Sequence, residues 1–278
     1  MASRLYQDAS SRLTRDEVKE VFGAVMDGNL NTISKFIKKY GINNIRDTRK
    51  YGWNQTLLHE AARKAQASVF QYLLGNQADT QVVDEYGQNL LHYACIGGNL
   101  DIVTTAVGLG LDINNTIEDG PTPIHLAALN NHVQVVQYLH EKGAKINCVD
   151  EDGWTPIHMA ANTGHVQVVQ YLHEKGANIN CVDEDGPTPI HLAALHNHVQ
   201  VVQYLHEKGA KINCVDEYGD TPLHEAALSG SLAVVKYITD HGANIHAVNK
   251  VHIFDDVHME HTTEEPQLSE PLGTRSGP

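Results

Sequence analysis

Residues 150–182 read DEDGWTPIHMAANTGHVQVVQYLHEKGANINCV, and this stretch decides the fold. Asp150 and Gly153 suit the first and fourth positions of a type I turn, where Asp and Gly are favoured. Thr155 can cap a helix that begins with Pro156, because the first amides of a helix have no internal partner and proline has no amide hydrogen to lose. The stretch therefore predicts a tight turn that leads directly into a helix.

Two helices follow within the same stretch. The first is short and ends at about Asn162, after which Gly164 allows the positive φ of a tight helix–helix turn. The second, over about 166–174, repeats valine and leucine at helical spacing and therefore buries one face. Gly176 ends it with a left-handed cap, and residues 177–182 continue as an extended segment.

One residue marks the same place in successive copies of this unit. A histidine recurs every 33 residues, at His59, His92, His125, His158, His191 and His224. A fixed period of this length indicates a stack of one supersecondary unit, in which each copy contacts only its neighbours. It also favours function at an extended surface over function at a single pocket.

The order of turn, T-P-x-H, helix, turn, helix and G-A-x-I-N closely resembles the ankyrin repeat. The motif is TPIH at 122–125, 155–158 and 188–191, TPLH at 221–224, and the weaker TLLH and NLLH at 56–59 and 89–92. The resemblance implies an all-α solenoid of about seven helix–turn–helix units with short β-hairpin-like turns. In that family the recurring histidine is structural and forms hydrogen bonds between neighbouring units.

The array has recognisable limits in the sequence. Residues 1–15 form a lead-in, 16–249 form the array, and 250–278 form an acidic tail. The first unit is an N-terminal cap, which a capping box at Thr14 and Glu17 opens. The tail is rich in proline and acidic residues, which predicts a short cap followed by disorder, with a truncated eighth repeat as the alternative.

The second unit is the least regular. Ala65 and Gln77 stand where most units have the glycine that follows a helix. Both places require a left-handed backbone, which costs a residue with a side chain more than it costs glycine. We therefore predict that this repeat opens first.

Composition narrows the class of partner. The formal net charge of −14 disfavours nucleic acid, whose binding depends on Lys and Arg. No stretch approaches the ~20 apolar residues of a membrane span, and the N-terminal residues contain no apolar block that could act as a secretory signal. We expect a soluble, cytoplasmic monomer that contacts no membrane, with a nuclear location or export into a host cell left open.

The spacing of the repeats argues against shared chemistry along the stack. Cys148, Cys181 and Cys214 lie one period apart. Stacked helices lie ~8–10 Å apart, whereas a disulfide needs Cα atoms within ~7 Å. The same spacing keeps the periodic histidines from holding one metal ion. We expect reduced thiols, no metal and no cofactor.

No catalytic motif is present either. The sequence contains no nucleophile elbow, phosphate loop or dinucleotide fingerprint, and the array leaves no room for a catalytic domain. We therefore expect no catalytic residues and no enzyme. The resemblance implies one possible modification, because some ankyrin repeats are hydroxylated at an asparagine in the place of Asn147, Asn180 and Asn213. The alternative is an asparagine that only fixes the backbone of a turn.

The resemblance implies a non-enzymatic module that binds proteins through turn tips and the inner helices of a concave face. Acidic and aromatic residues in these places favour a partner that presents Lys or Arg. The candidate contacts are Tyr51, Trp53, Tyr86, Asp119, Glu151, Asp152, Trp154, Asp185, Tyr218 and Asp220 at the turn tips, and Met159, Asn162, His196 and Glu225 on the inner helices. Two alternatives stay open: a secreted effector of an intracellular microbe that binds host proteins, and an adaptor whose array is only a spacer.

The 18 histidines predict a dependence of stability on pH. A histidine that is buried and neutral in the folded protein gains a proton when the chain unfolds in mild acid. We therefore predict a lower melting temperature at pH 5 than at pH 7.5.

Overall fold

The computed structural model describes residues 13–47, 54–117 and 120–250. Within them the chain forms 14 α-helices arranged as seven successive pairs. The pairs are α1 (Arg15–Met26) and α2 (Leu30–Tyr40); α3 (Leu57–Arg63) and α4 (Ala67–Gly75); α5 (Leu90–Gly97) and α6 (Leu100–Gly108); α7 (Pro123–Leu129) and α8 (Val133–Glu141); α9 (Pro156–Asn162) and α10 (Val166–Glu174); α11 (Pro189–Leu195) and α12 (Val199–Glu207); α13 (Pro222–Leu228) and α14 (Leu232–Asp240). The prediction of an all-α array of about seven units is confirmed.

The turn, the N-cap and the two glycines predicted for the unit at 150–182 are all present in the structure. Gly153 donates its backbone N–H to the Asp150 carbonyl at 3.0 Å, which closes the predicted turn. Thr155 is extended at the N-cap of α9 and Pro156 is its first residue. Gly164 and Gly176 have φ of +78° and +95° and follow α9 and α10. Both helices of this unit therefore have the expected bounds.

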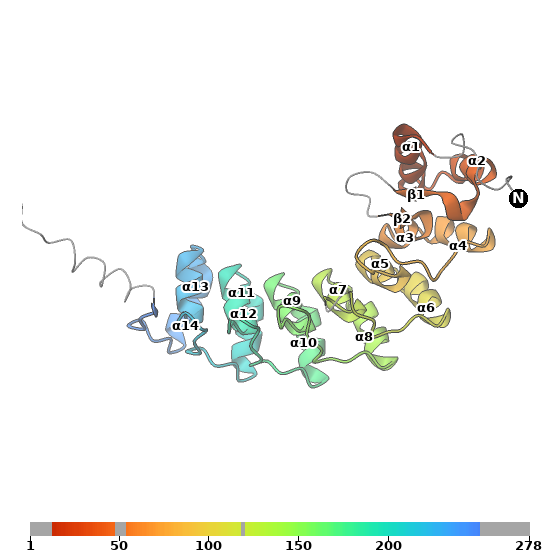
Figure 1. Cartoon of the computed structure of the whole chain (residues 1–278). Coiled ribbons are helices and arrows are strands. Elements are labelled where there is room, and N and C mark those ends of the chain that lie inside the picture. The colour runs from red at the N-terminus through yellow and green to blue at the C-terminus, as the bar shows by residue number, and fades with distance from the viewer. Residues whose placement is uncertain (1–12, 48–53, 118–119, 251–278) are drawn as a thin grey trace, which may run out of the picture.

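The pairs stack into a curved row (Figure 1). Helices α7, α9, α11 and α13 lie along its inner side, with α8, α10, α12 and α14 along its outer side, and each inner helix contacts the next. Val168, Val169 and Leu172 of α10 are fully buried, as are their counterparts in α12. The core is therefore one continuous apolar layer between successive pairs.

The first pair is joined to the second by a small sheet. After a short 3-10 turn, η2 (Ile42–Asn44), strand β1 (Arg46–Asp47) pairs antiparallel with β2 (Gln55–Thr56), with Arg46 opposite Thr56. The predicted capping box of α1 is confirmed, because Thr14 and Glu17 exchange backbone and side-chain hydrogen bonds. This pair has no turn of its own before α1 within the described residues.

Candidate protein-binding surface

One aspartate holds each of the turns before α5, α9, α11 and α13. Asp150 accepts hydrogen bonds from the backbone N–H groups of Asp152 and Trp154, at 3.2 and 2.8 Å. Asp84 and Asp216 make the same pair of bonds in their own turns. We call the segments 84–88, 150–154, 183–187 and 216–220 the turn row. Its side chains project from a fixed backbone.

The periodic histidines, which we call the first row, connect one repeat to the next. The backbone N–H of Thr122 donates to His125 Nδ1 at 3.1 Å, and His125 Nε2 contacts the Trp154 carbonyl oxygen at 2.9 Å. A backbone N–H can only donate and a carbonyl can only accept, so the ring carries its hydrogen on Nε2. His59, His92, His191 and His224 repeat this arrangement, with Nε2 at 3.1–3.2 Å from a carbonyl further along the array.

Two further rows of histidines also connect the repeats. His132, His165 and His198 reach back 36 residues and contact a carbonyl oxygen at the end of the preceding inner helix, at 2.9–3.0 Å. On the outer helices, His140, His173 and His206 each contact a tyrosine hydroxyl 31 residues further on, at 2.9–3.1 Å. The histidines of these rows therefore connect neighbouring repeats.

Burial keeps five of the periodic histidines neutral. Desolvation lowers the pKa of His59, His92 and His158 to about 4. The same cause lowers the pKa of His125 and His191. At pH 7 these rings carry no charge, which matches their role as one acceptor and one donor.

An asparagine row runs along the exposed loops. Asn147 donates from Nδ2 to the Gly176 carbonyl at 3.1 Å and accepts from the Asn178 N–H at 3.1 Å. Asn213 makes the same two contacts with Gly242 and Asn244. Asn180 accepts the Lys211 N–H at 3.2 Å. These side chains hold neighbouring loops together, which is the backbone-fixing role, and they remain exposed.

The four cysteines are unpaired, as the repeat spacing predicts. Burial raises the pKa of the thiols of Cys148, Cys181 and Cys214. Each of the three lies within 3.8 Å of the histidine 23 residues before it. That histidine is occupied by the repeat contact, so the pair has a structural role.

The candidate aromatic contacts differ in exposure. Tyr86 and Tyr218 are 50% and 54% exposed. Trp154 is half-buried, with its ring 6.3 Å from that of His158 and in hydrogen-bond contact with the Asp183 carboxylate. Its indole therefore supports the neighbouring turn and presents only part of its surface. Tyr51, Trp53 and Asp119 lie outside the described residues.

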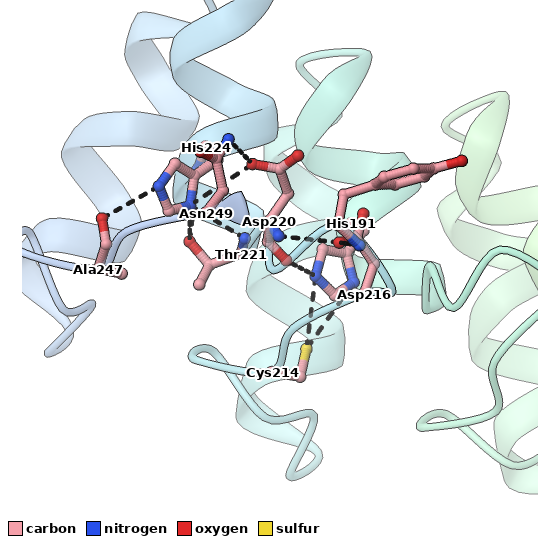
Figure 2. A network of polar contacts seen from close by, with 9 residues as sticks. His191, Cys214, Asp216, Asp220, Thr221, His224, Ala247 and Asn249 are labelled. Carbon is pink, nitrogen blue, oxygen red and sulfur yellow. Dashed lines mark hydrogen bonds and ion pairs between the residues drawn. The ribbon is translucent and has the colours of Figure 1, made fainter. Parts of the chain in front are cut away.

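Acidic side chains gather in the last repeat. Carboxylate oxygens of Asp216, Asp220 and Glu225 lie within 4.8 Å of one another, which brings together two predicted contacts and one turn aspartate. Figure 2 shows Asp216 and Asp220 in a network between His191 and His224. Asn249 donates to Asp220 at 2.6 Å. Burial, followed by the charges of Asp220 and Asp216, raises the pKa of Glu225.

The remaining candidates extend this surface along the row. Glu151, Asp152, Asp185 and His196 are exposed, and Met159 and Asn162 are half-buried on α9. The turn row contains no Lys or Arg, and neither do α5, α7, α9, α11 and α13. On α3, Arg63 is held by Glu60 at 2.8 Å. The inner side and its turns are therefore acidic or uncharged from α5 onward.

Comparison with known families agrees with this architecture. The sequence model of the ankyrin-repeat family matches residues 21–117, 98–183 and 175–249. The chain belongs to the ankyrin-repeat family. A comparison with curated proteins found no match. No helix among the described residues of this ankyrin-repeat protein is long and apolar enough to cross a bilayer.

Sequence reasoning missed part of this surface. Asp216 is absent from the predicted contacts, and its approach to Glu225 depends on the position of the inner helix against its own turn. The second and third rows of histidines were also not assigned to contacts. The signal for them is present, because HVQVVQYLHE occurs three times at the same period, and each copy begins with a histidine and has a second one just before its final glutamate.

Proposed function

We propose that this ankyrin-repeat protein binds a protein partner along the inner side of the array, without catalysis, and that the partner presents Lys or Arg. Ankyrin repeats are generally protein-interaction modules, so the family supports the general role. The observation that carries the finer proposal is the charge pattern. Acidic side chains line the turn row, and no Lys or Arg lies on the inner helices from α5 to α13.

The acidic group of the last repeat is the strongest anchor on this surface. Asp220 and Glu225 are half-buried, and the three carboxylates lie close enough to repel one another. A guanidinium or ammonium group placed among them would relieve that repulsion and gain charge-assisted hydrogen bonds. Exposed Tyr218 lies in the same turn and offers a ring face to such a cation.

The rigidity of the turns suits this role. Because the turn aspartates and the histidine rows fix the backbone, binding orders few additional groups and loses little conformational entropy. A surface of this kind binds through a few anchors separated by one repeat. A spacer has no such requirement for one sign of charge on one side.

Partner capture with Trp154→Ala and with Asp220→Asn/Glu225→Gln tests the proposal. We expect both variants to capture less of the partner that wild-type protein captures, because one removes an aromatic contact and the other removes two negative charges at constant shape. Thermal melting of each variant provides the stability control. Undiminished capture by both variants at unchanged melting temperature contradicts the proposal.

A further inference from the structure

The C-terminal end of the array exposes an apolar surface. Leu228 at the end of α13 and Leu232 at the start of α14 are 83% and 79% exposed, and Ile245 in the following loop is 65% exposed. We call these three residues the end face. Figure 1 shows that α13 and α14 are the last described pair. No further pair among the described residues covers the end face.

The same positions are less exposed in earlier repeats, where the counterparts of Leu228 and Leu232 are half-buried. Ile179, two repeats before Ile245, is only 8% exposed. Ala194 is fully buried, whereas its counterpart Ala227 is exposed. Val248 is also exposed, but it is not part of the end face, because its counterparts Val182 and Val215 in earlier repeats are themselves 59% exposed. The end face is therefore built as a contact between repeats, and the contacting element is missing from the described residues.

The other end of the array is different. The exposed side chains of α1 are mostly charged, as in Arg15, Asp16, Lys19 and Glu20, and the one large apolar exception, Met26, is 49% exposed. Repeat arrays need a polar terminal unit, because an uncovered repeat interface is an exposed apolar patch. The N-terminal end meets this requirement with α1 itself. The C-terminal end does not meet it within residues 13–250.

The chain leaves the last repeat along the path of an incoming repeat. The Lys250 N–H donates to the Tyr218 carbonyl at 2.8 Å. In earlier repeats the backbone N–H groups of Glu184 and Glu217 make the corresponding bonds. They donate to the backbone carbonyls of Asp152 and Asp185, at 3.1 and 3.2 Å, where one turn meets the next. The described chain therefore ends where the turn of a further repeat would begin.

The residues that follow have the composition of a cover. Residues 251–259 read VHIFDDVHM and contain five large apolar side chains, and then the sequence becomes polar. The segment lacks the T-P-x-H motif of a repeat. It is tethered at Lys250, so its effective concentration at the end face is ~mM without any binding partner. These features favour this segment over a separate chain.

We propose that residues 251–259 pack against the end face in the same chain and close the apolar core, with Phe254 and Ile253 as the main contacts. The array then ends in a short non-repeat cap of which Asp255 and Asp256 form part of the polar side. A second copy of the chain that buries its own end face against the first is the competing occupant.

Hydrogen exchange of the full chain tests the proposal through Ile253→Ser/Phe254→Ser. We expect amides of α13 and α14 to exchange at least about tenfold faster in this variant, since an apolar side chain leaves their surface. Leu268→Ser is the matched control, because it changes an apolar residue outside the segment and leaves exchange unchanged. In a Leu232→Ser background, the double substitution should accelerate exchange of these amides less, because the contact between Leu232 and residues 253–254 is already lost.

The molecular mass of the particle in solution distinguishes a cover from the same chain from a second copy of the chain. We expect one chain per particle over a wide concentration range for wild type. Unchanged exchange in the Ile253→Ser/Phe254→Ser variant overturns the proposal. A two-chain particle that dissociates on Leu232→Ser, but not on the double substitution, overturns it in favour of a second copy.

Discussion

At the scale of single residues, histidine side chains connect neighbouring repeats through hydrogen bonds. Five of the periodic histidines accept a backbone N–H on Nδ1 and donate from Nε2 to the next repeat, as His125 does between Thr122 and Trp154. Both contacts require the neutral ring, since protonation of Nδ1 removes the acceptor. Stability must then depend on the charge state of these rings.

The pH dependence follows from the lowered pKa values. His59, His92 and His158 have a pKa of about 4 in the folded protein against 6.5 for an unperturbed ring. Between these values the unfolded chain binds more protons, so the free energy of unfolding falls as pH falls, by on the order of 3 kcal/mol per ring over the whole interval. This stability is complete above pH 6.5 and is lost towards pH 4. We expect circular dichroism melts to give a lower melting temperature at pH 5 than at pH 7.5, and an equal or higher value contradicts the account.

A second prediction at this scale concerns Gly164. A Cβ built there lies 2.4 Å from His198 Nδ1, whose ring is held by the Asn162 carbonyl. Gly176 has a similar positive φ but open space around it. Both substitutions to alanine cost about 1–2 kcal/mol for the left-handed backbone, and Gly164→Ala should cost about 1–3 kcal/mol more for the displaced ring. Urea unfolding measures the difference, and equal losses in the two variants would show that the His198 contact carries no stability.

At the scale of the element, each repeat follows local signals, and its irregularities are equally local. Ala65 and Gln77 adopt φ of +54° and +62°, as the alignment of their repeat with its neighbours requires. The stack imposes the left-handed conformation even where glycine is absent. The second repeat therefore carries a backbone cost at two positions.

This cost predicts where the array opens. We expect hydrogen exchange to be faster over residues 57–78 than over 156–176, since local opening follows local stability. Ala65→Gly should slow that exchange and raise the free energy of unfolding by about 0.5–1 kcal/mol. Slower exchange at 57–78 than at 156–176 in wild type would be inconsistent with this assignment.

The same scale shows what sequence can and cannot predict. Pro156, Gly164 and Gly176 act through their own backbone geometry, so the bounds of α9 and α10 could be predicted without any long-range contact. The approach of Glu225 to Asp216 depends on how a helix packs on its own turn. No propensity of either residue reports that packing.

At the scale of the whole molecule, the period makes the array predictable and its ends unpredictable. Internal repeats share one environment, so one well-chosen unit describes them all. The two ends have no such template: α1 presents charged side chains to solvent, whereas Leu228 and Leu232 in the last described pair remain exposed. What covers them depends on residues that lie outside the pattern.

The central claim is that the acidic inner side and turn row form the binding surface. The most direct measurement compares capture of one partner, at fixed salt, by two charge reversals in the same two repeats. Asp152→Lys/Asp185→Lys changes exposed residues of the turn row, and Glu174→Lys/Glu207→Lys changes exposed residues at the ends of α10 and α12. We predict that the first pair abolishes capture and the second retains it, because only the first reverses the charge that meets the partner. Equal loss, or equal retention, in the two pairs would contradict the claim.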